Sequence, residues 1–178
     1  MYNDIERVLL SQEVIEKRIE EIAAELDKEY DGKMPLVICI LKGSYMFFAK
    51  LSQCMKTKHN VDFMTISSYG SGTESSGKVK MMKDAEKNIE GRDVIIVEDI
   101  IDSGNTMSFL KNLFMERNPK SVKLVTLLDK PSRREVEITP DYCGFEVPDY
   151  FVVGYGLDYN EVYRNMPDIG ILKEEIYR

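Results

Sequence analysis

VIIVEDIIDSGNT, residues 94–106, carries the clearest structural signal in this chain. Four apolar residues come first, the acids Glu98, Asp99 and Asp102 follow, and a glycine turn comes behind them. A short apolar run without alternation is typical of a strand that is covered on both faces of a parallel sheet. The next residues favour a helix that stops at Pro119, so the stretch predicts the order strand, turn, helix.

The same order recurs on both sides of this stretch. PLVICILKGS (35–44) predicts a strand and a turn, and YMFFAKLSQCM (45–55) predicts the helix after them. Before them, SQEVIEKRIEEIAAELDKEY (11–30) has apolar residues at helical spacing, with Ser11 as a candidate N-cap. Further strands are expected in VDFMTISSYG (61–70), KVKMMK (78–83), SVKLVTLLDK (121–130) and YFVVGYG (150–156). We therefore expect an α/β fold of three layers, with a central parallel sheet and a smaller subdomain built from the N-terminal helix and the C-terminal segment.

The composition limits the kinds of function. With 178 residues, 43% of them hydrophobic and 31% charged, we expect one globular domain over residues 1–178. The 24 Lys and Arg residues and 31 Asp and Glu residues give a net charge of -7. This balance argues against a nucleic-acid surface and against a polybasic membrane contact. A phosphorylated ligand would therefore have to be attracted by local charge or by a metal ion.

The apolar runs and the cysteines indicate a cytoplasmic protein. The runs are far shorter than a membrane span, and the first residues, MYNDIERVLLSQ, lack a basic stretch followed by an apolar one. The three cysteines are an odd number with no CxxC pair, so neither a disulfide framework nor a zinc site is indicated. We expect no membrane partner and no nucleic-acid partner.

The glycine turn behind the acids is suited to an anion. In parallel α/β sheets, ligands bind beyond the carboxyl ends of the strands, near the point where the strand order reverses. The backbone N–H groups of residues 103–106, the positive end of the next helix and the hydroxyls of Ser103 and Thr106 would together hold a phosphate monoester. No lysine follows as in a nucleoside-triphosphate P-loop, and a single glycine does not match the dinucleotide-binding motif.

The acids indicate what the phosphate is attached to. Glu98 and Asp99 can accept hydrogen bonds from two neighbouring ribose hydroxyls, or hold waters on a hydrated Mg²⁺. Asp102 lies nearer the phosphate and could exchange a proton with a base. Singly, acids at a strand end are as often only solvated, and Ser103 and Thr106 could be an ordinary helix cap. In combination they predict a sugar with a phosphate at one end and its reactive carbon at the other.

These residues resemble those of a known family. VIIVEDIIDSGNT is similar to the phosphoribosyl-pyrophosphate motif of type I phosphoribosyltransferases. The stretches that resemble the bacterial hypoxanthine phosphoribosyltransferases, in this order, are LLSQEVIEKRIEEIA, LKGS, SSYGSGTESSGKVK, LLDKPSRR and GFEVPDYFVVGYGLDYNEVYRNMPDIGIL. The resemblance covers nearly the whole chain. It implies the three-layer type I phosphoribosyltransferase fold, with the small subdomain as a hood.

The resemblance assigns a phosphoribosyl-pyrophosphate site. Lys42, Gly43 and Ser44 would form the pyrophosphate loop, in which the Leu41–Lys42 peptide is commonly cis. Arg164 would contact the pyrophosphate itself. The other residues of this site would be Glu98, Asp99, Ser103, Gly104, Asn105 and Thr106.

It also implies a moving part and a cofactor. Ser68 and Tyr69 match a mobile loop that closes over the reacting centre, and the nearby glycines fit a lid. The cofactor would be Mg²⁺. Its ligands, direct or through water, would be Glu98, Asp99 and Asp158.

The purine site implied by the resemblance lies further along the chain. Lys130 matches the lysine that donates to the six-position oxygen, which would favour 6-oxopurines over adenine. Phe151 would stack on the purine, the Val152 backbone would read its edge, and Asp158 would lie beside it. Asp102 would act near N7 as acid/base or as hydrogen-bond partner.

The implied reaction belongs to purine salvage. The enzyme would transfer 5-phosphoribosyl from phosphoribosyl pyrophosphate to N9 of hypoxanthine or guanine, giving IMP or GMP and pyrophosphate. Family members are usually dimers or tetramers, so we expect a homo-oligomer. The sequence does not rank hypoxanthine against guanine, because Tyr150 occupies a position where relatives vary.

Two other functions share part of this pattern. A type I phosphoribosyltransferase for adenine or a pyrimidine would have the same phosphate motif, but DYFVVGYGLDYNEVYR and Lys130 resemble the 6-oxopurine branch. A regulator that senses phosphoribosyl pyrophosphate and binds nucleic acid is disfavoured by Asp102 and by the acidic charge balance. Outside the family pattern, Lys42 and Lys130 would be surface charges and Phe151 a core residue, and the role of Arg134 stays open.

Overall fold

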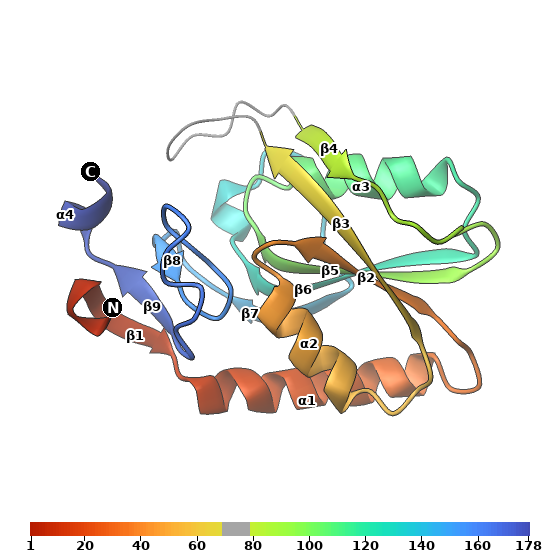
Figure 1. Ribbon diagram of the computed structural model, residues 1–178, viewed down its shortest axis with the longest axis horizontal. Coiled ribbons are helices and arrows are strands. Elements are labelled where there is room, and N and C mark those ends of the chain that lie inside the picture. The colour runs from red at the N-terminus through yellow and green to blue at the C-terminus, as the bar shows by residue number, and fades with distance from the viewer. Residues whose placement is uncertain (69–78) are drawn as a thin grey trace.

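The computed structural model describes residues 1–68 and 79–178, which form three layers (Figure 1). The central layer is a six-stranded sheet with the strand order β4-β3-β2-β5-β6-β7. Its strands are β2 (Leu36–Leu41), β3 (Asn60–Ser68), β4 (Val79–Lys83), β5 (Asp93–Ile101), β6 (Ser121–Asp129) and β7 (Tyr142–Glu146). Among the described residues, neighbouring strands of this sheet are parallel except β3 and β4, which are antiparallel. The predicted three-layer α/β fold is confirmed, with an antiparallel strand at one edge.

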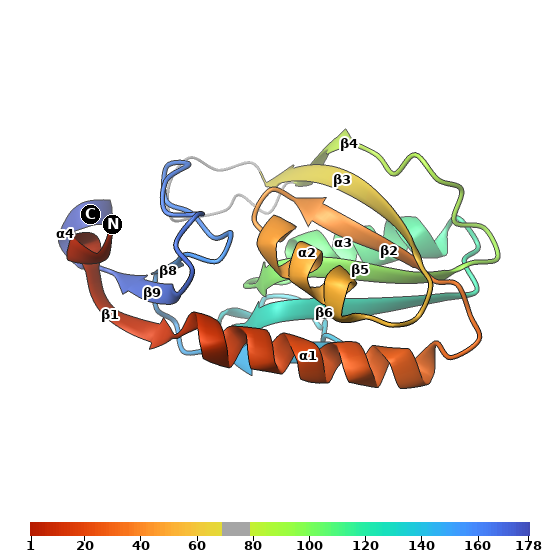
Figure 2. The ribbon, with the colours of Figure 1, turned by 60° about the horizontal axis from the view of Figure 1, so that its bottom comes forward.

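Helices cover both faces of this sheet; they are α1 (Gln12–Glu29), α2 (Tyr45–Cys54) and α3 (Asn105–Met115). Figure 2 shows α1 and α2 in front of the sheet and α3 behind it. Val37 and Cys39 of β2 pack with α1 and α2, while Leu36 and Ile38 pack with α3. Alternate residues of one strand thus enter two different cores, which is why the strand is apolar without alternation. No helix in the described part of the chain has both the length and the apolar character needed to cross a membrane.

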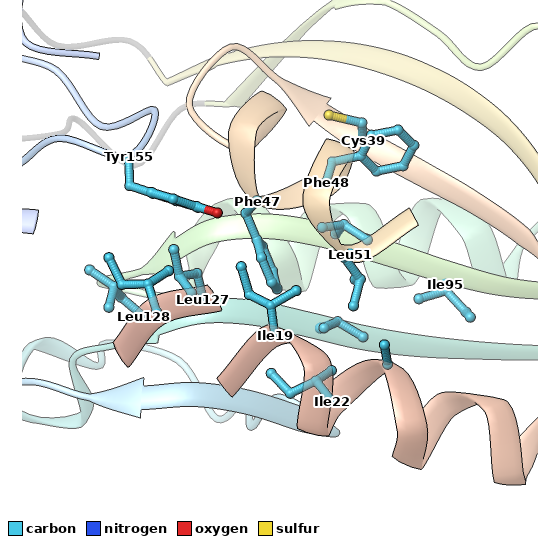
Figure 3. Close-up of a cluster of buried hydrophobic side chains, with 14 of the residues drawn as sticks. Ile19, Ile22, Cys39, Phe47, Phe48, Leu51, Ile95, Leu127, Leu128 and Tyr155 are labelled. Carbon is cyan, nitrogen blue, oxygen red and sulfur yellow. The ribbon is translucent and has the colours of Figure 1, made fainter. Parts of the chain in front are cut away.

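The larger core lies between the sheet and the helices α1 and α2. Ile19 of α1, Phe47 of α2 and Leu127 of β6 are among its buried residues (Figure 3). The predicted N-cap of α1 is confirmed, because Ser11 Oγ accepts the N–H of Val14 at 3.4 Å. The sequence-based helix and its buried face are therefore both present.

A second, smaller sheet lies beyond the carboxyl ends of the parallel strands (Figure 1). Its strands, in the order β1-β9-β8, are β1 (Ile5–Leu10), β9 (Ile169–Leu172) and β8 (Val152–Val153). Both pairs are antiparallel, so the two ends of the chain lie side by side. A one-turn helix, α4 (Glu174–Tyr177), follows β9. The hood, as we call this sheet, has its own core of Ile5, Val153, Tyr163, Met166 and Leu172.

The hood differs in two respects from what the sequence predicts. The N-terminal helix was expected to help form it, but α1 packs on the large sheet, and the N-terminal contribution is β1. YFVVGYG (150–156) supplies only the two residues of β8 to the hood, and the sixth central strand is β7 instead. Strands β1 and β9 come from opposite ends of the chain and pair with each other. Such distant pairing leaves no pattern of apolar residues within a short stretch of sequence, so it could not be predicted.

Candidate active site

A pocket of about 770 Å³ lies between the carboxyl ends of the large sheet and the hood. The strand order reverses between the neighbouring strands β2 and β5: β3 follows β2 toward one edge of the sheet, and β6 follows β5 toward the other. Ligands of such sheets bind near this reversal, and the pocket lies at the same end of the sheet. Its lining includes six of the residues selected from the sequence, namely Asp99, Asp102, Lys130, Phe151, Val152 and Asp158. These residues lie in or directly after β5, directly after β6, and in or near β8 of the hood, and the fold brings them to one place.

The turn that begins α3 presents backbone N–H groups at the positive end of the helix. Gly104 has a φ of 86°, and a side chain there would also press on Ile138 and Arg134. The carbonyl of Ser103 accepts the N–H of Glu135 at 2.9 Å, which holds the turn from outside. The first N–H groups of a helix have no partners within it, and the helix dipole makes this end positive. Residues 103–106 thus have the geometry expected for a phosphate site.

The loop after β2 packs closely against the acids of β5. A Cβ atom at Gly43 would overlap the carboxylate of Asp99, and one at Gly156, where φ is 100°, would overlap the carbonyl oxygen of Gly43. Ser44 is buried, and its hydroxyl donates to a backbone carbonyl of β2. The Leu41–Lys42 peptide is cis, as the family pattern implies. Only glycine fits at position 43, between β5 and the hood.

Lys42 and Arg164 are held together by a shared acid. Lys42 Nζ lies 2.9 Å from Glu161 Oε2, and Arg164 Nη2 lies 3.2 Å from Glu161 Oε1. Arg164 also donates to the carbonyl of Gly156 at 2.8 Å and pairs with Asp158 at 2.9 Å. Arg164 Nε is buried and donates to no acceptor within the described residues. The sequence did not reveal Glu161, whose contact with Lys42 joins residues far apart along the chain.

Glu98 and Asp99 form a crowded pair of carboxyl groups. Both keep part of their surface exposed, yet protein surrounds them on most sides. Burial raises the pKa of Glu98 well above its ordinary value, and the charge of Asp99 raises it further. Burial also raises the pKa of Asp99. The N–H of Ile100, which donates to the Asp99 carboxylate at 2.7 Å, lowers this pKa but does not outweigh burial. Glu98 Oε2 is buried and accepts no hydrogen bond from the described residues.

This pair fits a hydrated divalent cation. Within residues 1–68 and 79–178, no three His, Cys, Asp or Glu side chains come together as a protein metal site. Mg²⁺ in phosphate-binding enzymes does not need such a cage, since it is commonly held by one or two carboxylates, waters and substrate phosphates. Asp158 does not join the other two acids here but pairs with Arg164.

The pocket is also lined by a buried lysine, Lys130. Lys130 is 7% exposed, and its Nζ donates to the carbonyl of Tyr150 at 2.7 Å. Burial lowers the pKa of Lys130, while the charges of Asp102 and Asp149 act in the opposite direction. Arg133 lies beside Asp102, and the charge of Asp102 raises the pKa of its guanidinium. Sequence reasoning did not select Arg133 or Asp149.

Phe151 lies among aromatic side chains of the hood. Tyr177 stacks on it with ring centres 4.6 Å apart, and Tyr159 meets it edge to face at 5.6 Å. Tyr177 also lines the pocket, and no motif in the sequence pointed to it. Of the two residues that the family pattern assigns to a mobile loop, Ser68 ends β3, and Tyr69 lies outside the described residues.

Several known proteins are similar in sequence to nearly the whole of this chain. Residues 8–160 match the family described as the phosphoribosyl transferase domain. The chain is 55% identical to the hypoxanthine-guanine phosphoribosyltransferase of Bacillus subtilis, covering 99% of this chain and 98% of that one. It is also 56% identical to the bifunctional protein TilS/HprT of Listeria monocytogenes, but it spans only 27% of that protein's length.

Solved structures agree with these relatives. A hypoxanthine phosphoribosyltransferase from Staphylococcus aureus superposes with a TM-score of 0.95 at 48% identity, covering 100% of this chain and 97% of that one. A hypoxanthine-guanine phosphoribosyltransferase from Bacillus anthracis superposes with a TM-score of 0.90 at 47% identity, covering 95% and 99%. These findings confirm the resemblance stated from the sequence. The chain belongs to the phosphoribosyltransferase family, with hypoxanthine-guanine phosphoribosyltransferases among its close relatives.

Proposed function

We propose that this protein is a hypoxanthine-guanine phosphoribosyltransferase of purine salvage. The observation that carries the proposal is one pocket that joins Asp102, Lys130 and Phe151 to the carboxylate Asp99, next to the anion-binding turn of α3. A phosphate site, a sugar site and a base site thus lie in sequence along one sheet edge. The reaction transfers 5-phosphoribosyl from phosphoribosyl pyrophosphate to N9 of a 6-oxopurine.

In this proposal the sugar phosphate lies along β5. The turn of Ser103, Gly104, Asn105 and Thr106 holds the 5′-phosphate, because its N–H groups are free of helix partners. Glu98 and Asp99 lie in β5, shortly before this turn, and the two ribose hydroxyls would bind beside them. Their crowding supports a cationic ligand, since a nearby cation would offset both the burial of Glu98 and the charge of Asp99, which raise the pKa of Glu98 in that order.

The pyrophosphate would lie between the loop after β2 and the hood. Lys42, the backbone at Gly43 and Ser44, and Arg164 surround this position, and the buried Arg164 Nε finds no acceptor in the part of the chain that the structure describes. Lys42 and Arg164 would exchange their contacts with Glu161 for contacts with phosphate oxygens. Mg²⁺, held by Glu98, Asp99 and Asp158 directly or through water, would neutralise charge on the leaving pyrophosphate when bound.

The base would lie between Phe151 and Asp102. Lys130, whose ammonium group can only donate, would bind the oxygen at position six. Phe151 would stack on the ring, while the Val152 backbone and Asp158 would face its opposite edge. Asp102 would accept a hydrogen bond from the N–H at N7 of the purine, or exchange a proton with N7 while N9 forms its bond to the sugar. Because both bonds at the sugar carbon are long in such transfers, the transition state would resemble an oxocarbenium ion.

The proposal is tested by product analysis. The purified protein is mixed with Mg²⁺, phosphoribosyl pyrophosphate and hypoxanthine, guanine, adenine or a pyrimidine, and nucleotides are separated by chromatography. IMP and GMP should form, and AMP and pyrimidine nucleotides should not. No nucleotide from any base would favour the regulator that only senses phosphoribosyl pyrophosphate. Omission of Mg²⁺ should abolish product formation.

The proposal also extends to the whole protein. We infer a single phosphoribosyltransferase domain over residues 1–178 that works as a homodimer or homotetramer in the cytoplasm. Family membership supports each of these points, and the extensive core shared by α1, α2 and the sheet supports the single domain. Analytical ultracentrifugation of the purified chain tests the oligomeric state, with a monomer at micromolar concentration as the contrary result.

A further inference from the structure

Arg133 covers one oxygen of the Asp102 carboxylate. It ends a single 3₁₀ turn, Pro131–Arg133, that follows β6, and its Nε lies 2.8 Å from Asp102 Oδ1. Oδ1 is buried, although the Asp102 side chain as a whole is 45% exposed. The contact is an ion pair whose N–H is not aligned for a hydrogen bond. The oxygen left open to a ligand is therefore Oδ2.

The backbone of Asp102 is held separately by the next arginine. Arg134 Nη1 donates to the carbonyl of Asp102 at 2.5 Å, and Arg134 Nη2 pairs with the carboxylate of Asp129. Arg134 and Asp129 are largely buried, with side chains 15% and 11% exposed. This pair fixes where the backbone of Asp102 lies. Rotation of the side chain is the freedom that remains, and Arg133 restricts it.

Arg133 is itself oriented from the hood side. Its Nη1 lies 3.3 Å from Asp149 Oδ2, and Asp149 Oδ1 lies 3.7 Å from Lys130 Nζ. Charges of alternating sign thus run from Asp102 through Arg133 and Asp149 to Lys130. The two ends of this row are the groups that the proposed function places at N7 and at the six-position oxygen of the base.

Building on the proposed function, we infer that Arg133 is a positioning residue, which turns the Asp102 carboxylate so that Oδ2 faces N7 of the purine. Arg133 touches neither the sugar nor its phosphates in this arrangement. Its loss should therefore slow the transfer while leaving phosphoribosyl-pyrophosphate binding nearly unchanged. Misplacement of a catalytic group by about 1 Å can reduce a rate up to about a hundredfold, so we expect about a tenfold fall in kcat for Arg133→Gln.

A double-mutant cycle tests this role. The kcat and both KM values are measured with hypoxanthine for the unmodified chain, Arg133→Gln, Asp102→Asn and the double variant. If Arg133 acts through Asp102, Arg133→Gln lowers kcat about tenfold in the unmodified background and less than about twofold in the Asp102→Asn background. Arg133→Lys keeps the positive charge and should recover part of the loss. KM for phosphoribosyl pyrophosphate should stay within about twofold throughout.

A matched control separates positioning from general stability. Arg117 also pairs with an aspartate, Asp84 at 2.7 Å, beyond the other end of α3. Arg117→Gln should leave kcat unchanged. The melting temperature of Arg133→Gln should match that of Arg117→Gln within a few degrees. If Arg133→Gln melts at a much lower temperature, the positioning role is tested instead by the kcat of Arg133→Lys in the unmodified and Asp102→Asn backgrounds.

The outcomes are distinguishable. An equal loss of kcat in both backgrounds, or no loss from Arg133→Gln, would overturn the positioning role and leave the proposed function intact. If the unmodified chain makes no nucleotide from hypoxanthine or guanine, the proposed function is rejected, and the inference about Arg133 is rejected with it.

Discussion

Lys130 occupies an environment that restricts what its side chain can bind. The ammonium group is nearly buried and donates to the carbonyl of Tyr150, and the carboxylate of Asp149 lies 3.7 Å away. Hypoxanthine and guanine offer an oxygen acceptor at position six, whereas adenine offers an amino donor. An ammonium group has donors only, so the amino group of adenine would meet Lys130 donor to donor, and one N–H of the buried ammonium group would lack an acceptor.

For Lys130→Met we expect lower kcat/KM on hypoxanthine and guanine and a smaller preference for either over adenine. Sites built on such a hydrogen bond reject analogues that lack it by about 10⁴-fold or more, so the unmodified protein should have negligible activity on adenine. Steady-state kinetics with the three bases measures both effects. Lys120→Met, at an exposed lysine paired with Asp93, is the control. Unchanged oxopurine kinetics in Lys130→Met would remove the assigned role.

For Asp102→Asn we expect a large fall in kcat with little change in KM for phosphoribosyl pyrophosphate. The carboxylate faces the base pocket, and general acid–base groups usually contribute about 10²–10⁴-fold. The amide keeps the shape of the side chain, so binding of the sugar phosphate should be retained. Isothermal titration with phosphoribosyl pyrophosphate and Mg²⁺ checks this separately from turnover. Equal losses in both measurements would contradict the role.

At the residue scale, the sequence predicted the groups that belong to one local motif. Residues 98–106 could be assigned chemistry because the strand, the acids and the turn are consecutive. Arg133, Asp149 and Glu161 were not selected, because each is defined by a partner distant in the chain. Arg134, left open from the sequence, holds the Asp102 backbone. Tyr177 could not be found because its partner, Phe151, lies before β8 and is distant in the chain from α4, which carries Tyr177.

At the element scale, one carboxylate of α1 fixes the segment that follows α2. Asp27 accepts the N–H of Lys56 at 3.0 Å and the N–H of Thr57 at 2.8 Å. Burial raises the pKa of Asp27, but these hydrogen bonds outweigh it, and the pKa lies below its ordinary value. The ionised form is therefore favoured in the folded state.

The stability that Asp27 contributes should depend on pH. A lowered pKa in the folded state stabilises the protein above the unfolded value of about 3.9, and this contribution is lost as pH falls through the folded value. Asp27→Asn should therefore reduce the free energy of unfolding by about 1–3 kcal/mol at pH 7 and by less near pH 3. Urea unfolding at the two pH values measures the difference. A loss that is equal at both would show that ionisation is not involved.

The elements that the sequence predicted well share a strong local pattern of apolar residues. α1 was recognised from its spacing of apolar residues and from Ser11, and β2 and β5 were recognised from unbroken apolar runs. β1 and β9 were missed because their burial depends on each other. β7 was missed because it is only partly buried at a sheet edge and reads as a loop.

At the scale of the whole molecule, the hood depends on close contact between the two ends of the chain. A Cβ atom at Gly170 would lie 2.7 Å from the side chain of Ile5, which is so close that Ile5 or the strand that carries it would have to shift. Gly170 pairs with Val8 on one side and with Val153 on the other. A larger residue there should loosen the hood and leave the large sheet intact.

For Gly170→Val we expect a loss of about 1–3 kcal/mol in unfolding free energy, as is usual for overpacking. Hydrogen exchange should show faster exchange in residues 5–10 and 169–172 and unchanged protection in β2 and β5. Val8→Ala, at an exposed position of β1, is the control. Uniformly faster exchange across both sheets would mean that the hood and the large sheet open as one unit.

The pairing of β1 with β9 also sets the order of events during synthesis. Ile5 lies opposite Leu172, so the first strand leaves the ribosome long before its partner has been translated. At typical elongation rates this interval is roughly 10 to 30 s, which is long compared with the folding of most small domains. The strands of the large sheet and their helices are complete earlier in the chain and can fold during that time. A nascent chain should thus carry the formed turn before α3 but no closed pocket, and it should gain transferase activity only when β9 emerges.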